Sequence, residues 1–457
     1  MSGSPEGVYE AGIVNPGVPH PHPTESFWQK EPHTHAKYRS PWPSVTMDVV
    51  IIGTGVTGTN LAYNLLKKRP ELRVAAIDAR DLCSGATGRN GGHIKTMAFA
   101  VWEERKRRYG IEEAIRLTEF EHSHLGAMTS AAREKGIDCD ILPTEGLDAY
   151  FDQDSFDRAL TALKEMRAHA PSLAKHYTVH TDKGEAAKLD ERCVGAISVP
   201  AVSIWPYKLV AGLMGQLIDT GRLNVQTNTV VTSRDIAMVR TNRGNIEARA
   251  VVHATNGWLG HLLPELRPFV SPVRGNVVQY TPTNDPDRPS AFGYKSQFSY
   301  WLRYTDKDYD YLIQRKQGDV IVGRANSGRR TTGDDSETDL LPMAHLGGFV
   351  QEVAKSPAKN ASEHLGYKWS GILGFTQDGF PFVGRLPFPN REHQWVCGGY
   401  HGIGMTKAFR SAEMLALMLL GEEVPAEYPR SMLVTEERIG KLRKSLDRGN
   451  SISKAKL

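Results

Sequence analysis

The run that most constrains the fold covers residues 47–68, where an apolar stretch, a glycine turn and a helical pattern follow one another. Residues 48–52 are almost wholly apolar, as expected of a parallel strand covered on both faces. The turn 53–58 reads Gly-Thr-Gly-Val-Thr-Gly, and a second apolar stretch, 74–77, ends at Asp78. This order of strand, turn, helix, strand and acid predicts a dinucleotide site.

Each part of this run has a physical role in such a site. Gly53 is expected to make the tight turn, Gly55 to let the backbone approach a pyrophosphate, and Gly58 to let helix pack on strand. The helix N-terminus offers unpaired N–H groups and a partial positive charge to the phosphates. Asp78 is expected to accept hydrogen bonds from a ribose diol. These residues alone leave open which dinucleotide binds.

The composition excludes several classes of protein. A chain of 457 residues is too long for one compact core, which predicts two domains. A net charge of +4 without a basic, aromatic-rich stripe argues against nucleic acid binding. The four cysteines lack CxxC or zinc spacing, which favours a reducing compartment. No apolar run reaches about 18 residues, so no membrane span is predicted, and the start does not resemble a secretory signal.

The rest of the chain can be divided coarsely. Residues 1–46 are rich in Pro, His and Thr and are predicted to form an extended arm. The arm holds two His-x-His pairs, for which a solvated prolyl segment is favoured over a metal site: His20, His22, His33 and His35. Apolar periodicity predicts helices over 98–136, 154–169, about 207–220 and from about 407. Short strands are predicted at 223–227, 230–232 and 250–254, with antiparallel strands between about 272 and 327.

Two later segments favour an extended cofactor. Residues 250–258 form an apolar strand ending on small residues, and residues 397–405 form a glycine-rich loop before the last helix. Nucleotide-binding features therefore recur across the whole chain, whereas a nicotinamide site is confined to one contiguous unit. A helix N-terminus near residue 404 could stabilise negative charge on a reduced ring system.

Residues 84–92, Ser-Gly-Ala-Thr-Gly-Arg-Asn-Gly-Gly, resemble the GASGRNGG loop of FAD-dependent amine oxidoreductases. That family includes D-amino acid oxidase, glycine oxidase, sarcosine oxidase and gamma-glutamylputrescine oxidase, and the last type is the most similar overall. The resemblance covers nearly all of 25–425, through further motifs at 24–28, 272–275, 319–323 and 369–381.

The resemblance implies an α/β fold, with a Rossmann-type FAD-binding domain and an interleaved antiparallel-sheet α+β substrate domain. The FAD-binding domain is expected at 47–95, 195–260 and 370–425, and the substrate domain at 96–194 and 261–369. The arm 1–46 precedes them, and a C-terminal tail, 426–457, follows.

The resemblance also implies which residues contact FAD, from the pyrophosphate turn through the ribose and adenine to the loops beside the isoalloxazine. They are Gly53, Gly55, Val56, Thr57, Gly58, Asp78, Ala79, Arg80, Ser84, Thr87, Gly88, Arg89, Asn90, Gly91, Gly92, Val230, Thr255, Asn256, Gly399, Gly402, Ile403, Gly404 and Met405. For Arg89, a surface salt bridge is the alternative to a cofactor role.

Departures from the family pattern are informative. Sarcosine oxidase-like enzymes tether FAD through a cysteine where this chain has Gly371, so FAD is expected to be non-covalent. Their carboxylate-binding lysine aligns with Thr406, next to Lys407, and their oxygen-activating lysine aligns near Ile321. These differences favour a substrate without a carboxylate beside its amine. Cys397 is expected to be a buried small residue rather than a flavin ligand.

The candidate catalytic residues are His93, Tyr300, Arg324 and His401. The two histidines flank the loops expected near the isoalloxazine and could tune the flavin or carry a proton. Tyr300 belongs to an aromatic set, with Trp301, Tyr304 and Tyr311, that could bind an amine, although half-buried strands are often aromatic. Arg324, or Arg303, could bind an acidic tail of the substrate.

The predicted reaction is oxidation of an amine or amino acid to an imine, hydrolysed to an aldehyde or ketone, with O2 reduced to H2O2. A dehydrogenase of the same fold with another acceptor is the alternative, and a non-catalytic nucleotide-binding protein is a third. The ending Ala455-Lys456-Leu457 resembles a peroxisomal address, which predicts an import receptor as partner and a peroxisomal, otherwise cytoplasmic, location. A frayed basic tail is its alternative reading. The substrate, its chirality and the oligomeric state stay open.

Overall fold

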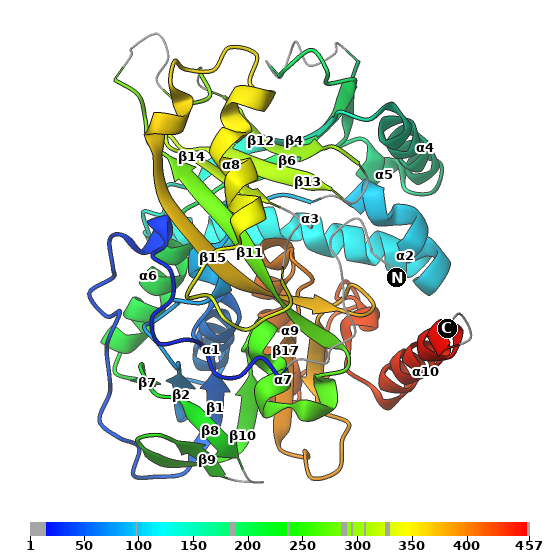
Figure 1. Ribbon diagram of the computed structural model, residues 1–457. Coiled ribbons are helices and arrows are strands. Elements are labelled where there is room, and N and C mark those ends of the chain that lie inside the picture. The colour runs from blue at the N-terminus through cyan, green and yellow to red at the C-terminus, as the bar shows by residue number, and fades with distance from the viewer. Residues whose placement is uncertain are drawn as a thin grey trace.

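The computed structural model describes residues 15–454 apart from 97, 182–188, 235–237, 285–289, 294–295, 306–307 and 325–329. Two sheets organise this part of the chain, one below the other in Figure 1. We refer to the sheet that carries the glycine turn as the first sheet and to the larger one as the second sheet.

The first sheet is mainly parallel. Its strands lie in the order β16 (Phe382–Arg385), β17 (Gln394–Gly398), β10 (Gly244–His253), β1 (Met47–Ile52), β2 (Val74–Ile77) and β7 (Leu223–Gln226). Only the β16–β17 pair along this order is antiparallel. The short strands β8 (Val231–Arg234) and β9 (Met238–Thr241) extend it through antiparallel pairing with each other and with β10.

Helices cover the first sheet because their apolar stripes face its central strands. α1 (Val56–Lys68) lies between α6 (Pro206–Asp219) and α9 (Ala408–Leu419) and contacts both. Leu61 and Leu65 of α1 are fully buried in the same cluster as Val49 and Ile51 of β1. The main core therefore sits between these helices and the strand that leads into the glycine turn.

The second sheet is mainly antiparallel and forms the other wall of the molecule. Its order is β15 (Leu365–Thr376), β11 (Val270–Tyr280), β14 (Val320–Arg324), β13 (Tyr309–Gln314), β12 (Phe298–Arg303), β4 (Leu142–Tyr150), β6 (Gly195–Ser203) and β3 (His93–Ile94), with β5 (Thr178–His180) beside β6. The β12–β4 pair is parallel. The long strands β11 and β15 run diagonally from this sheet down to the first (Figure 1).

The remaining helices lie around the second sheet and at the end of the chain. They are α2 (Trp102–Tyr109), α3 (Ile111–Glu134), α4 (Gln153–His169), α5 (Pro171–Ala174), α7 (Leu259–Leu262), α8 (Leu340–Val353) and α10 (Glu436–Lys454). Short 3-10 turns complete the list: η1 (Phe27–Gln29), η2 (Ala86–Arg89), η3 (Ala98–Val101), η4 (Asn256–Trp258), η5 (Pro264–Leu266), η6 (Ala361–His364), η7 (Gly404–Thr406) and η8 (Arg430–Met432).

The main elements predicted from apolar periodicity are present. The predicted helix 98–136 is divided at Gly110, whose φ of +84° suits glycine and separates α2 from α3. Strands β4 and β6 were not predicted, because each contains a proline and small residues rather than a β-branched run. Both are nonetheless paired along their whole length.

The sheet topology places some boundaries elsewhere than predicted. β6 and β15 belong to the second sheet, although residues 195–203 and 370–376 were assigned to the FAD-binding domain. β3 also pairs with β6 there. The loop 84–92, which leads into β3, and the strand β15 therefore connect the first sheet with the second. The cavity described below lies where they do so.

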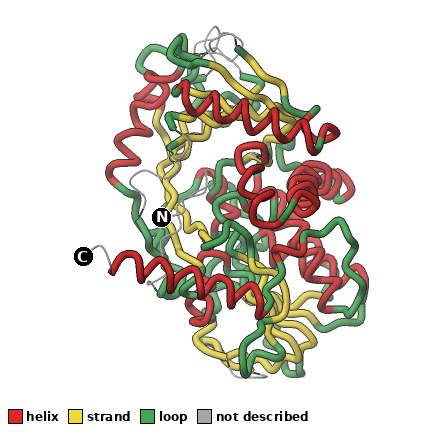
Figure 2. The backbone as a smooth tube through the Cα atoms, turned by 90° about the vertical axis from the view of Figure 1, so that its right-hand side faces the viewer, coloured by secondary structure: helices red, strands yellow, loops and turns green. Residues whose placement is uncertain are grey.

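The chain's last described segment is a helix within the predicted C-terminal tail. Figure 2 shows α10 lying along the outside of the molecule. Ile439 and Leu442 are buried in an apolar cluster, and Arg438 forms a bidentate pair with Asp378, with Nε–Oδ2 at 2.9 Å and Nη2–Oδ1 at 3.0 Å. The sequence showed only polar residues with scattered apolar ones, and the tertiary contacts fix the helix. The predicted import signal, 455–457, lies outside the described residues.

The contact between β1 and α1 leaves no room for a side chain. A Cβ at Gly58 would lie 1.9 Å from the carbonyl oxygen of Gly53. A Cβ at Gly53, whose φ is +109°, would lie 2.6 Å from the carbonyl oxygen of Ala254. The first turn of α1 is therefore fixed against two parallel strands.

We expect Gly58→Ala to destabilise the protein by about 1–3 kcal/mol, the usual cost of overfilling a close-packed contact. The extra methyl group would push α1 away from Gly53 and displace the turn amides, so retention of the FAD that the sequence predicts should fall as well. Denaturant unfolding and the visible absorbance of the purified protein measure the two effects.

Gly126→Ala is the matched control, because Gly126 lies on α3 with nothing within 4 Å of the added Cβ. Alanine is the better helix former at such a site, by roughly 0.5–1 kcal/mol. Equal stability of the two variants would contradict the close contact at Gly58.

Candidate active site

A large cavity lies where the first sheet's parallel strands end and the second sheet begins. Its walls include Gly53–Thr57 after β1, Asp78–Arg80 after β2 and Ala254–Asn256 after β10. The second sheet contributes Gly371–Leu373 of β15 and side chains from β3, β12 and β13. The empty space is about 1920 Å³, including the part open to solvent. Because the lining comes from both sheets, an extended ligand in this cavity would contact each of them.

The glycine turn is held in place by Asp78. Its Oδ2 accepts hydrogen bonds from the backbone nitrogen of Thr54 at 2.9 Å and from Thr54 Oγ1 at 2.7 Å, and its Oδ1 accepts one from Arg80 N at 3.0 Å. Burial raises the pKa of Asp78, whereas these hydrogen bonds and Arg80 lower it. Asp78 therefore ties the end of β2 to the turn and also lines the cavity.

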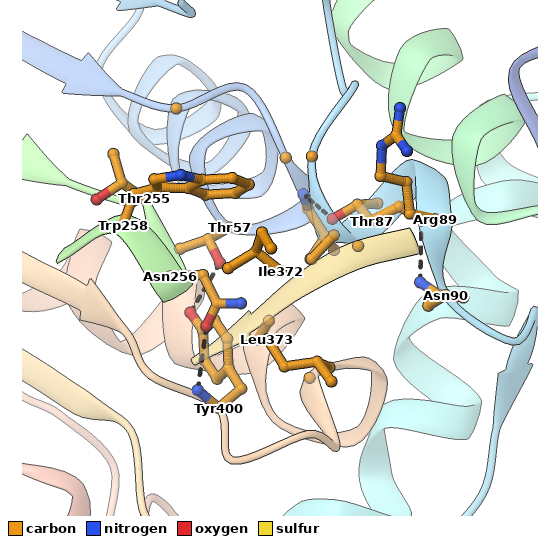
Figure 3. Close-up of a pocket in the computed structure, with 18 of the residues that line it drawn as sticks. Thr57, Thr87, Arg89, Asn90, Thr255, Asn256, Trp258, Ile372, Leu373 and Tyr400 are labelled. Carbon is orange, nitrogen blue, oxygen red and sulfur yellow. Dashed lines mark hydrogen bonds between the residues drawn. The ribbon is translucent and has the colours of Figure 1, made fainter. Parts of the chain in front are cut away.

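The loop 84–92 continues this wall. Thr87 Oγ1 accepts a hydrogen bond from Val56 N at 3.1 Å, which joins the loop to the first residue of α1 (Figure 3). The predicted cofactor residues that line the cavity are Gly53, Gly55, Val56, Thr57, Asp78, Ala79, Arg80, Thr87, Arg89, Asn90, Gly91, Val230, Thr255, Asn256, Gly402, Ile403, Gly404 and Met405. Those that do not are Gly58, Ser84, Gly88, Gly92 and Gly399.

The predicted glycines outside the cavity have a structural reason to be glycine. A Cβ at Gly88 would lie 2.5 Å from the carbonyl oxygen of Cys83, and one at Gly92 would lie 2.4 Å from the ring of Trp28. Gly399 has a φ of +78° and donates its backbone N–H to Asn256 Oδ1 at 3.1 Å. These glycines shape the loops, and other residues form the wall.

Arg89 points away from the cavity and clamps its surroundings (Figure 3). Its guanidinium donates to the carbonyl oxygens of Ser84, Ser370 and Thr24, each at 2.8 Å. Burial lowers the pKa of Arg89 to about 10, and Asp335, at 3.7 Å, opposes this. Because Arg89 is buried, it does not form a surface salt bridge, and its cofactor role stays a prediction that its place in the cavity lining allows.

Asp335 is the counter-charge for two buried arginines. Arg80 Nη1 lies 2.9 Å and 3.0 Å from its two carboxylate oxygens, and Asp335 is fully buried. The backbone oxygen of Asp335 accepts from Thr24 N at 2.8 Å. This cluster therefore joins the end of β2, the loop before α8 and the N-terminal segment.

We call residues 15–26 the N-terminal strap. Gly17, Val18 and Pro19 line the cavity, and the carbonyl oxygen of His20 accepts from Arg80 at 3.3 Å. At its start Asn15 contacts His261 of α7, with Oδ1 3.3 Å from Nδ1. Figure 1 shows this part of the chain in dark blue beside α7. The strap thus closes one side of the cavity.

The glycine-rich loop after β17 is held by Asn256. Its Oδ1 accepts from the backbone nitrogens of Gly399 and Tyr400, at 3.1 Å and 3.2 Å. The hydroxyl of Tyr400 lies 2.7 Å from Thr57 Oγ1 of α1, and Figure 3 shows these side chains together at one end of the cavity. The turn, the end of β10 and the last loop are therefore one connected unit.

The second sheet supplies an aromatic end to the cavity, which we call the aromatic chamber. It is lined by Trp301 of β12, Tyr309 and Tyr311 of β13, and His93 and Lys95 at β3. The ring centroids of His93 and Tyr311 lie 5.3 Å apart, edge to face. Burial, followed by the neighbouring Lys95, holds the pKa of His93 well below its usual value. His93 is thus neutral, and its predicted position at the site is observed.

The other candidate catalytic residues do not line the cavity. Tyr300 faces the opposite side of β12, where its hydroxyl lies 2.6 Å from Ser296 Oγ, so its neighbour Trp301 takes the expected place. Arg324 is occupied by Asp308 and Asp310, at 2.9 Å and 3.0 Å. The alternating sequence of this strand predicts an aromatic residue at the site, but it does not decide which of the two neighbours faces the cavity.

His401 is also turned away. Its Nδ1 accepts from Thr376 N at 3.1 Å, and burial lowers its pKa to about 3. Its φ of +54° lets the glycine-rich loop turn. Tyr304 and Arg303 are likewise outside the lining, bound to Asp310 at 2.9 Å and to Asp148 at 2.5 Å.

The departures from the family pattern can now be placed. Gly371 lines the cavity, so no thiol is available at that point, and the four cysteines are buried outside the cavity lining. Thr406 lines the cavity, whereas Lys407 is buried on the other side with Nζ 3.2 Å from the carbonyl oxygen of Gly379. Ile321 lies in the core outside the cavity.

Several lining residues were missed from the sequence. Thr54 was read only as part of the turn, Trp258 was read only as the last residue of the segment 250–258, and His261 lies beyond that segment. Lys95 was not considered, although it follows His93 at the alternation expected of a strand. That alternation was the one signal that could have placed Lys95 on the same face.

Two further features concern the described residues only. No group of three or more His, Cys, Asp or Glu in this part of the chain could hold a metal ion, the His-x-His pairs included. Within the same residues, no helix is both long and apolar enough to cross a membrane.

Comparison with known proteins identifies similar chains. The model of a family described as FAD dependent oxidoreductase (DAO) matches residues 48–418. The probable oxidoreductase OrdL of Rhizobium meliloti is 26% identical over 85% of this chain and 86% of its own length. Gamma-glutamylputrescine oxidoreductase of Escherichia coli is 23% identical over 87% and 89%.

Among solved structures, glycine oxidase from Geobacillus kaustophilus superposes with a TM-score of 0.67. It is 19% identical, and the match covers 86% of this chain and 99% of that one. The predicted fold class is thereby confirmed.

We expect Asp335→Asn to destabilise the protein strongly, because it leaves two buried guanidinium groups without their counter-charge. Removing one partner of a buried pair typically costs about 3–5 kcal/mol. Denaturant unfolding measures the loss, and faster flavin release would report opening of the strap. Glu437→Gln is the control, since its partner Lys441 lies on the exposed surface of α10. Equal losses in the two variants would contradict the cluster's role.

We expect Asp78→Ala to weaken flavin binding at least about tenfold, since hydrogen bonds to charged groups are worth about 1.5–3 kcal/mol each. The turn would lose the acceptor that fixes Thr54 and Arg80. Flavin released by acid precipitation and titration of the apoprotein measure this change. Asp81→Ala, outside the cavity lining, is the control. Unchanged flavin content in Asp78→Ala would reject the assignment.

Proposed function

The chain belongs to the DAO family of FAD-dependent oxidoreductases, and we propose that it oxidises the carbon–nitrogen bond of a small amine with O2 as electron acceptor. In the net reaction, a primary amine, water and O2 give an aldehyde, ammonia and H2O2. With an N-substituted substrate, an amine leaves in place of ammonia.

The residues present fit FAD. Gly55 and Thr57 at the N-terminus of α1 line the cavity, and a helix N-terminus is a suitable site for the pyrophosphate. Thr255 Oγ1 is buried at the cavity wall and has no hydrogen-bond partner among the described residues, so a bound ligand can provide one. Gly371 offers no thiol and Cys397 is not in the lining, which supports non-covalent binding.

The protein positions the substrate and excludes water. FAD, when bound, supplies the hydride acceptor for the substrate's α-carbon. Trp301 and Tyr309 are nearly completely buried, at 5% and 6% exposed, and form an apolar chamber with Tyr311. Aromatic faces bind organic cations and amines. The chamber therefore holds the amine at the wall opposite the glycine turn.

The aromatic chamber is the observation that carries the amine assignment. Among the described lining residues the arginines are Arg80 and Arg89, and both guanidiniums bind protein groups instead of facing the chamber. A substrate without a carboxylate next to its amine suits this arrangement. The name of the Escherichia coli relative, gamma-glutamylputrescine oxidoreductase, refers to an amine of that kind and supports the proposal.

A dehydrogenase or biosynthetic oxidoreductase with another acceptor is the second candidate. It is favoured by Ile321, which stands near the place of the oxygen-activating lysine in the resemblance and lies in the core. Peroxisomal location remains a proposal from the sequence of residues 455–457 alone. Fusing the C-terminal segment to a fluorescent protein in cells with peroxisomes tests it, and diffuse fluorescence would reject it.

We expect at least one amine without an α-carboxylate to bleach the flavin anaerobically and to yield one H2O2 per O2 consumed in air. The panel contains primary amines, N-methyl amines and both enantiomers of amino acids, so that either chirality is covered. Stopped-flow absorbance and a peroxidase-coupled assay provide the measurements. Bleaching without peroxide would support the second candidate, and bleaching by amino acids alone would contradict the chamber argument.

A further inference from the structure

Lys95 gives the aromatic chamber a polar group that the proposed function, on which the following rests, does not yet use. It is only 2% exposed and lines the cavity. Its Nζ donates to the carbonyl oxygen of Tyr300 at 2.5 Å and lies 4.3 Å from the ring centroid of Trp301. One N–H is therefore directed to the backbone, and the amine lies beside Trp301, which also lines the cavity.

The charged groups nearest Lys95, Asp148 and Arg303, already neutralise each other. Asp148 on β4 is held by Arg303 on β12, with Arg303 Nε 2.5 Å from Asp148 Oδ1. Among the described residues, no carboxylate forms an ion pair with Lys95. The other titratable groups facing this region are His93 on β3 and Tyr309 and Tyr311 on β13. Burial holds the pKa of Lys95 well below its usual value, with Asp148 raising it and Arg303 lowering it.

A protonated substrate and a protonated Lys95 cannot share this chamber. Amines in water near neutral pH are mostly ammonium ions, whereas loss of hydride from carbon requires the neutral amine, whose lone pair becomes part of the imine. Two cations in one dry chamber repel each other strongly, since the low dielectric does not screen them. One proton must therefore leave before oxidation.

We propose that Lys95 is a catalytic base that takes the proton from the bound substrate ammonium. The N–H bond of the ammonium breaks and its electron pair stays on the substrate nitrogen. The lone pair of Lys95 Nζ forms the new N–H bond, so no oxidant or reductant is involved. The resulting cation is stabilised by the Tyr300 carbonyl, the face of Trp301 and the carboxylate of Asp148.

The first test is the pH dependence of flavin bleaching by the amine found in the panel. In the wild type, the rate should rise with pH. The rising part of this pH–rate profile, its limb, should lie below the pKa of the free amine. In Lys95→Met the proton must leave to solvent, so the limb should move up to the amine's own pKa. At neutral pH the rate should fall about 10²–10⁴-fold, the usual worth of a general base, and recover at high pH. An unmoved limb would overturn the proposal.

Two variants distinguish a proton acceptor at Lys95 from a fixed positive charge and from a base at His93. Lys95→Arg keeps a positive charge but cannot accept a proton at these pH values. It should therefore lose rate like Lys95→Met, whereas wild-type behaviour would mean that charge alone acts. His93→Asn tests the other chamber nitrogen, and a limb that moves in His93→Asn but not in Lys95→Met would overturn the proposal. Flavin content confirms that each variant has folded.

A binding experiment that needs no turnover keeps this inference separate from the proposed function. Tetramethylammonium is a cation without a proton to lose and suits an aromatic chamber. Followed through the flavin spectrum from pH 6 to 10, it should bind the holoenzyme more tightly as Lys95 loses its proton. The limiting slope is about tenfold per pH unit, as expected for a one-proton competition.

Lys95→Met should bind tetramethylammonium with no such dependence on pH. If no amine bleaches the flavin but this difference is found, the proposed substrate class fails and the protonation behaviour of Lys95 stands. The same pH dependence in both proteins would overturn the assignment to Lys95.

Discussion

The site depends on one close contact in the backbone. Gly58 on α1 lies against the carbonyl oxygen of Gly53, and Gly53 lies against Ala254. Because no side chain fits between them, α1 begins directly at the ends of the parallel strands β1 and β10. The start of the helix, from Gly55 to Thr57, consequently lines the cavity. Asp78, Thr87 and Asn256 then attach the neighbouring loops to this fixed point.

The second sheet is brought to that point by continuous strands rather than by a hinge. β11 and β15 pair along most of their length and extend from the second sheet to the cavity wall. The buried cluster of Arg80, Arg89 and Asp335 fastens the same region through charge. The second sheet is therefore fastened beside the glycine turn at several points, which suits a site that must keep a carbon atom close to a cofactor.

The dinucleotide half could be predicted because its function is encoded in local backbone geometry. Gly53, Gly55 and Asp78 act through a turn that the sequence specifies within a few tens of residues. The substrate half, on the second sheet, could not be predicted, because its lining depends on which face of a strand meets the cavity. Tyr300 and Trp301 are neighbours on β12, but only Trp301 lines the cavity. Which of the two does so depends on how β12 pairs with β4 and β13. Lys95 was missed for the same reason, since β3 has only two residues.

The N-terminal strap sets an order of events during synthesis. Thr24 leaves the ribosome early, yet its partners Asp335 and Ser370 lie 311 and 346 residues later in the chain. The strap can therefore dock only after the last strand of the second sheet has been made. Until then the cavity lacks the part of its wall that Gly17, Val18 and Pro19 form in the finished fold.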